Sequence, residues 1–158
     1  MTNRPTSKEL LGVEILAGLG PATLDVLAHS AELRHLTDGE TLYEQGGQAH
    51  ELFIVTHGRL ALRVSDGDRW TTVQSVEAED VLGWSALRED PHWLTTARAL
   101  GPVDVIAIPL AAILDLFEKG GPDARRIAQR LFGVGAVHLE SIRQQLQQPA
   151  RDTIITGG

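Results

Sequence analysis

Between about Glu32 and Pro109 the chain alternates short apolar runs with glycine-containing turns, and this pattern constrains the fold more than any other feature. The turns fall at Asp38-Gly39, His57-Gly58, Asp66-Gly67 and Gly101-Pro102. Short strands at this spacing, separated by such turns, are typical of an antiparallel sandwich or barrel. The central part of the chain is therefore predicted to be mainly β.

Helical periodicity replaces this pattern at both ends of the chain. Apolar residues over 10–19 lie mostly on one side of a helix whose N-cap would be Ser7, and a second helix follows the break at Gly20. After the strands, residues 110–119 predict a helix, and a longer helix is expected over residues 122–148. The expected organisation is an N-terminal helical segment (1–30), a β domain (31–109), C-terminal helices (110–148) and a tail (149–158).

The long helix carries an apolar stripe that recurs at three- and four-residue steps. A helix of this length exceeds what one small barrel can cover, so part of the stripe is expected to face a second copy of the chain in a homodimer. The alternative is that the helix folds back onto its own barrel. The candidate dimer-interface residues are Ile127, Leu131, Val134, Leu139, Ile142 and Leu146.

The composition argues against several classes of function. The formal net charge is -7 and there is no long basic run, so a DNA or other nucleic-acid partner is not expected. The absence of cysteine excludes thiolate catalysis and cysteine-ligated metals. No apolar stretch has membrane-spanning length and the N-terminus lacks a signal-peptide segment, so a cytoplasmic protein without a membrane partner is expected.

No sequence motif indicates an enzyme, a metal site or a cofactor. The chain contains neither a nucleophile elbow, nor a GxxxxGK[ST] loop, nor a dinucleotide fingerprint. His50 and His57 are seven residues apart, and on one strand this odd spacing would place them on opposite faces. We therefore expect a protein that is not an enzyme and that holds no metal and no cofactor.

The segment "DGETLYEQGGQAHELFIVTHGRLAL" resembles the opening of a cyclic nucleotide-binding domain, the ligand-sensing module of the catabolite activator family and of regulated channels and kinases. The matching motifs are Gly39-Glu40, Gly46-Gly47, Phe53-Ile54-Val55 and Gly58. The resemblance continues through "DVLGWSAL", "TARAL" and "VIAIP", and it spans about residues 10–146. It implies an antiparallel double-stranded β-helix, or jelly roll, flanked by N-terminal helices and a long C-terminal helix.

The resemblance also implies a phosphate-binding cassette that begins at Gly83. In the family a short helix directs its amides at the cyclic phosphate, a Glu accepts from the ribose hydroxyl, and an Arg pairs with the phosphate. Here Trp84 holds the Glu position, Trp93 the Arg position and Leu94 the Ser/Thr position after it. A loop one residue longer or shorter would place Leu94 or His92 at the Arg position. The candidate residues of this degenerate site are Gly83, Trp84, Ser85, Ala86, Leu87, His92, Trp93, Leu94 and Thr95.

Losing both charged groups would weaken binding by about two to four powers of ten. The sequence therefore predicts a non-enzymatic regulatory or interaction module that does not bind cyclic nucleotides in the usual way. The competing prediction is a small-molecule sensor that binds cyclic AMP or GMP unusually, or an apolar ligand, in the cassette pocket. The tryptophans could fill the emptied pocket, line a pocket for a less polar ligand, or lie outside it and contact a protein partner. Only "PARDTIITGG" follows Gln148, too short for a helix-turn-helix, and a stand-alone domain is expected.

Overall fold

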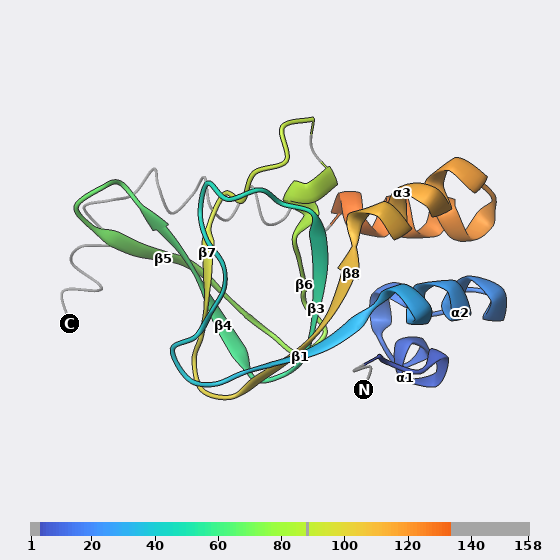
Figure 1. Cartoon of the computed structure of the whole chain (residues 1–158), viewed down its shortest axis with the longest axis horizontal. Coiled ribbons are helices and arrows are strands. Elements are labelled where there is room, and N and C mark those ends of the chain that lie inside the picture. The colour runs from blue at the N-terminus through green and yellow to red at the C-terminus, as the bar shows by residue number, and fades with distance from the viewer. Residues whose placement is uncertain (1–3, 88, 134–158) are drawn as a thin grey trace.

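The structure, a computed structural model, describes residues 4–87 and 89–133, without the side chains of Leu11, Trp84 and Leu87 (Figure 1). Two antiparallel four-stranded sheets form a roll, one in the order β1-β8-β3-β6 and the other in the order β2-β7-β4-β5. The strands are β1 (Glu32–Leu36), β2 (Thr41–Tyr43), β3 (Glu51–His57), β4 (Arg59–Ser65), β5 (Trp70–Glu77), β6 (Val81–Leu82), β7 (Thr96–Ala99) and β8 (Val103–Pro109). The predicted mainly β fold with flanking helices is confirmed.

The helices gather beside the first sheet, at one end of the roll (Figure 1). They are α1 (Ser7–Leu11), η1 (Glu14–Leu16), α2 (Pro21–Ser30) and α3 (Leu110–Lys119), with a further helix over residues 122–133 and a short 3₁₀ helix, η2 (Trp84–Leu87), within the roll. Within the described residues, no helix is long and apolar enough to cross a membrane.

The N-terminal segment differs from its prediction in two respects. The single helix expected through residue 19 is divided into α1 and η1, with Gly12 as the C-cap of α1. The N-cap of α1 is Thr6, because its hydroxyl accepts from the Glu9 amide while the Glu9 carboxylate accepts from the Thr6 amide. Ser7 lies one residue inside the helix, and its hydroxyl donates to Asp25.

The first sheet is buried on both faces. On β3, Phe53 and Val55 point into the core inside the roll, whereas Leu52 and Ile54 point into a second core beneath the helices. This alternation follows from the two-residue period of a strand. It explains why β3 is almost continuously apolar, whereas the outer face of the second sheet carries the exposed Arg98 beside the buried Ala61 and Thr96.

The helix over residues 122–133 packs against its own chain. Ile127 and Leu131 are buried in the second core, together with residues of α2 and β8. Nη1 of Arg130 donates to the carbonyl oxygens of Ile15 at 2.7 Å and Ala17 at 2.9 Å. Apolar packing and hydrogen bonds therefore both join this helix to the N-terminal segment.

Candidate functional site

The cassette segment keeps the backbone frame that the resemblance implies. Gly83 joins β6 to η2 with φ +97°, a left-handed conformation that glycine adopts without strain. A Cβ at this position would lie 2.5 Å from the carbonyl oxygen of Glu51, so only glycine fits. The Ala86 amide donates to the Gly83 carbonyl at 2.8 Å, and the Ser85 and Ala86 side chains are buried. The Trp84 and Leu87 side chains lie outside the described part of the structure.

Trp93, which the sequence analysis predicts to hold the position of the family's phosphate-pairing Arg, lies in the core of the roll. Its side chain is only 7% exposed. Its ring stacks on Tyr43 with a centroid distance of 4.0 Å and an interplanar angle of 18°, and its centroid lies 6.0 Å from that of Phe53. The backbone is also fixed, because Trp93 N donates to Gly47 O and Trp93 O accepts from Gly46 N, both at 2.9 Å.

Tyr43 belongs to this site although the sequence analysis did not identify it. Burial raises the pKa of its phenol to about 12, while a hydrogen bond with the Thr95 side chain acts in the opposite direction. Thr95 is itself buried. The sequence gives no clear signal for it, because Leu42 and Tyr43 are consecutive apolar residues that strand alternation places on opposite faces.

The structure does not bring all the candidate residues together. His92 is partly exposed, and its Nδ1 lies 2.7 Å from an Asp90 carboxylate oxygen, so its ring contacts the loop itself. Leu94 is only partly buried. Trp93 and Thr95 both contact Tyr43, and the Trp93 ring lies beside Gly83, 3.2 Å from where a Cβ on that glycine would stand.

The candidate dimer-interface residues divide into two groups. Ile127 and Leu131 are almost fully buried within their own chain, so their side chains are not available to a partner. On the same helix Phe132 is 80% exposed. The other four, Val134, Leu139, Ile142 and Leu146, lie outside the described residues.

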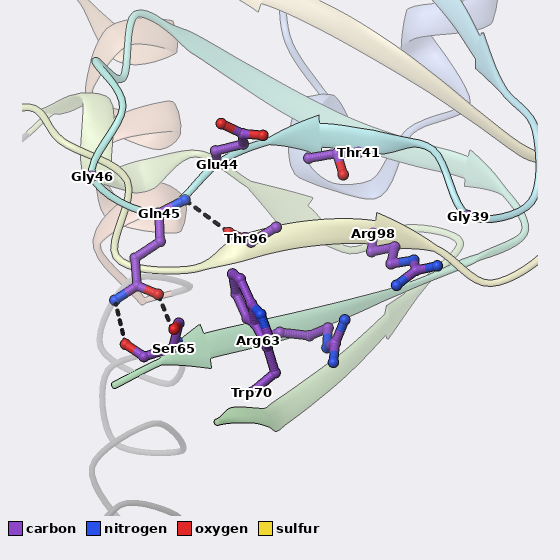
Figure 2. A pocket seen from close by; sticks show the side chains of 10 residues that line it. All are labelled: Gly39, Thr41, Glu44, Gln45, Gly46, Arg63, Ser65, Trp70, Thr96 and Arg98. Carbon is purple, nitrogen blue, oxygen red and sulfur yellow. Dashed lines mark hydrogen bonds between the residues drawn. The ribbon is translucent and has the colours of Figure 1, made fainter. Parts of the chain in front are cut away.

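A separate pocket of about 610 Å³ lies on the outer face of the second sheet (Figure 2). Its lining residues are Gly39, Thr41, Glu44, Gln45, Gly46, Arg63, Ser65, Trp70, Thr96 and Arg98. The sequence analysis did not identify this pocket. In the part of the chain that the structure describes, no group of three His, Asp or Glu residues is placed to hold a metal ion.

The two sheets and the glycine turn of the cassette segment define a jelly-roll domain. The family model of the cyclic nucleotide-binding domain matches residues 33–119, and the chain belongs to this family. No curated protein matches the chain significantly.

Solved structures share the fold. A Geobacter metallireducens protein named as cyclic nucleotide-binding has a TM-score of 0.75 and 22% identity, covering 85% of this chain and 98% of its own. A cyclic nucleotide-binding domain from Methylobacillus flagellatus has a TM-score of 0.74 and 15% identity, and the match covers 90% of this chain and 83% of that domain. The sensor domain of the transcriptional regulator DNR from Pseudomonas aeruginosa has a TM-score of 0.68 and 20% identity, and the match covers 80% of this chain and 91% of that domain. At these identities the similarity establishes the fold alone.

Proposed function

We propose that this chain is a non-enzymatic regulatory or interaction module whose cassette does not hold a cyclic nucleotide in the way usual for its family. The observation that carries the proposal is the burial of Trp93 against Tyr43, at the position that the resemblance predicts for the phosphate-pairing Arg. Of the three roles considered for the tryptophans, this placement supports the filling of the pocket for Trp93.

The energetics support the same conclusion. Removing a buried aromatic side chain from a core costs about 3–5 kcal/mol, so displacing Trp93 would consume a large share of the roughly 8 kcal/mol available to a micromolar ligand. The ligand would then meet no Arg at this position. A charge-assisted hydrogen bond to phosphate would have contributed about 1.5–3 kcal/mol.

The test is isothermal titration calorimetry of the purified chain with cyclic AMP, cyclic GMP and cyclic di-GMP. We expect no binding tighter than about 10 μM, the affinity that corresponds to roughly 7 kcal/mol. We also expect saturating nucleotide to leave the NMR signals of Gly83 and Trp93 unchanged, because Trp93 fills the space in the cassette. Tight binding that moves the NMR signals of Gly83 and Trp93 would refute the proposal.

We further propose that the module acts as a homodimer. Phe132 supports this, because it is 80% exposed on the helix that carries the predicted stripe, and aromatic side chains are enriched at protein interfaces. Light scattering at micromolar concentration should give the mass of two chains. A monomer mass would contradict the proposal.

A further inference from the structure

The second sheet presents two arginines on its outer face, at the pocket of Figure 2. On β4 and β7 the inner-face residues Leu62 and Ala97 lie in the core, so Arg63 and Arg98 project outward by strand alternation. Arg63 pairs with Thr96, and Arg98 pairs with Ala61 two positions along β4. The two arginines are therefore diagonal neighbours, a spacing that long side chains span.

Neither guanidinium is neutralised by a carboxylate among the described residues, since neither Arg63 nor Arg98 takes part in an ion pair there. Glu44 is the one acidic residue that lines the pocket. In Figure 2 its carboxylate points away from both guanidinium groups. In a chain of formal net charge -7, this leaves a local positive site directed at the pocket.

The pocket also has a flat apolar surface. Trp70 is 50% exposed, and the Arg63 guanidinium lies 5.2 Å from its ring centroid. The exposed part of the indole offers a flat surface on which another ring can pack.

One wall of the pocket is held in place by hydrogen bonds (Figure 2). The Gln45 side chain accepts from Ser65 N at 2.8 Å and donates to Ser65 O at 3.4 Å. Gln45 N donates to the Thr96 hydroxyl oxygen at 2.9 Å, which leaves the hydroxyl hydrogen available as a donor. These bonds fix the segment after β2 against β4 and β7.

We propose that this pocket binds a small ligand that combines one carboxylate or phosphate group with a flat ring. The acidic group accepts from the paired guanidinium groups of Arg63 and Arg98, and the ring packs on Trp70. The volume of about 610 Å³ lies within the range of small-molecule sites. This site is separate from the cassette and does not depend on it.

The test is calorimetric titration with 1-naphthoate and adenosine 5′-monophosphate, which present the two acidic groups, and with inorganic phosphate as the ring-free comparison. We expect saturable binding of at least one ring-bearing probe. Arg63→Gln and Arg98→Gln should each weaken it at least about tenfold, the effect of losing one charge-assisted hydrogen bond. Trp70→Ala should lower the affinity for the ring-bearing probe to a value close to the affinity for phosphate.

The matched control is Arg59→Gln, which removes an exposed arginine from the same strand but outside the pocket. Arg59→Gln should bind the ring-bearing probes with the affinity of the wild type. Circular dichroism should show that all variants remain folded. No saturable binding of either ring-bearing probe, or an equal loss in Arg59→Gln, overturns the proposal. Binding of a glutamate-rich peptide without binding of the small probes also overturns it, in favour of an acidic protein segment.

The same variants separate this site from the cassette, because cyclic AMP also carries a phosphate and a ring. Cyclic AMP bound at this pocket loses affinity in Arg98→Gln. Cyclic AMP bound in the cassette keeps its affinity in Arg98→Gln, and that result contradicts the proposed function instead.

Discussion

Trp93 connects the cassette to the core of the roll, because its ring stacks on Tyr43 and reaches the Cβ position of Gly83. Trp93→Ala should therefore lower the free energy of unfolding by about 3–5 kcal/mol, the usual cost of removing a large buried aromatic ring. Urea denaturation followed by circular dichroism measures this. The control is Trp70→Ala at a half-exposed position, which should cost less than about 1 kcal/mol. Similar values for both variants would show that Trp93 is not a core residue in solution.

Glu79 is strained in a way that a glycine would relieve. Among the described residues it is the one non-glycine with positive φ, at 80°, and its carboxylate accepts from Glu14 N at 2.9 Å. Glu79→Ala and Glu79→Gly both lose this hydrogen bond, but only glycine relieves the backbone. The glycine variant should be the more stable of the two by about 1 kcal/mol, measured by urea denaturation. The usual order at an unstrained site is the reverse, and finding that order would refute the strain.

For Trp84 and Trp93, the sequence predicts the loss of charge but not the direction of the side chains. The missing charges of the cassette were predicted at Trp84, from the motif that begins at Gly83, and at Trp93, by counting back from the Thr96–Ala99 strand; neither this position nor its neighbours His92 and Leu94 is an Arg. The inward direction of the Trp93 ring could not be predicted, because it depends on the space beside Tyr43, which lies fifty residues earlier in the chain. Packing across that separation is decided by strand register and not by local pattern.

For the helix over residues 122–133, too, the sequence predicts the apolar face but not the surface that covers it. Its apolar stripe was predicted from periodicity, but periodicity marks an apolar face without naming what covers it. In the structure Ile127 and Leu131 are covered by their own chain, as the fold-back alternative holds for these two positions. Phe132, beside the stripe, is left exposed.

Two adjacent substitutions on this helix should therefore have opposite consequences. Leu131→Glu places a charge in the second core and should unfold the domain or destabilise it by more than about 3 kcal/mol. Phe132→Glu changes an exposed side chain, so it should keep the fold and shift the mass measured by light scattering from two chains to one. Circular dichroism separates the two outcomes. A folded monomer from Leu131→Glu would instead place that residue at the dimer interface.

At the scale of the whole molecule, the roll was predictable because glycine turns and strand alternation are local signals that repeat along the chain. The outer pocket was not predictable. Arg63 and Arg98 become neighbours only through the pairing of β4 with β7, and a β-bulge between Leu62 and Arg63 shifts the pairing of β4 with β5, the strand that carries Trp70. Neither the pairing nor the bulge leaves a mark in the sequence.

The packing of the two sheets around Tyr43 should make the whole roll less stable as pH rises through the alkaline range. Burial raises the phenol pKa from 10.0 to about 12, so between these values the unfolded chain loses a proton that the folded chain retains. The unfolded state then binds fewer protons, and the free energy of unfolding falls as pH rises, by roughly 2–3 kcal/mol across this window. Tyr43 is the chain's single tyrosine, so the ultraviolet absorbance of tyrosinate reports on it alone.

We expect tyrosinate to appear together with the loss of circular dichroism as pH rises from 10 to 12, and not before it. Lysines titrate in the same range, so the comparison is with Tyr43→Phe, which keeps the ring and lacks the ionisable group. This variant should lose about 1 kcal/mol at neutral pH with its hydrogen bond to Thr95, yet show a shallower decline of stability with alkaline pH. Tyrosinate formation near pH 10 in a chain that is still folded would mean that the phenol reaches water, and that the core around Trp93 is open.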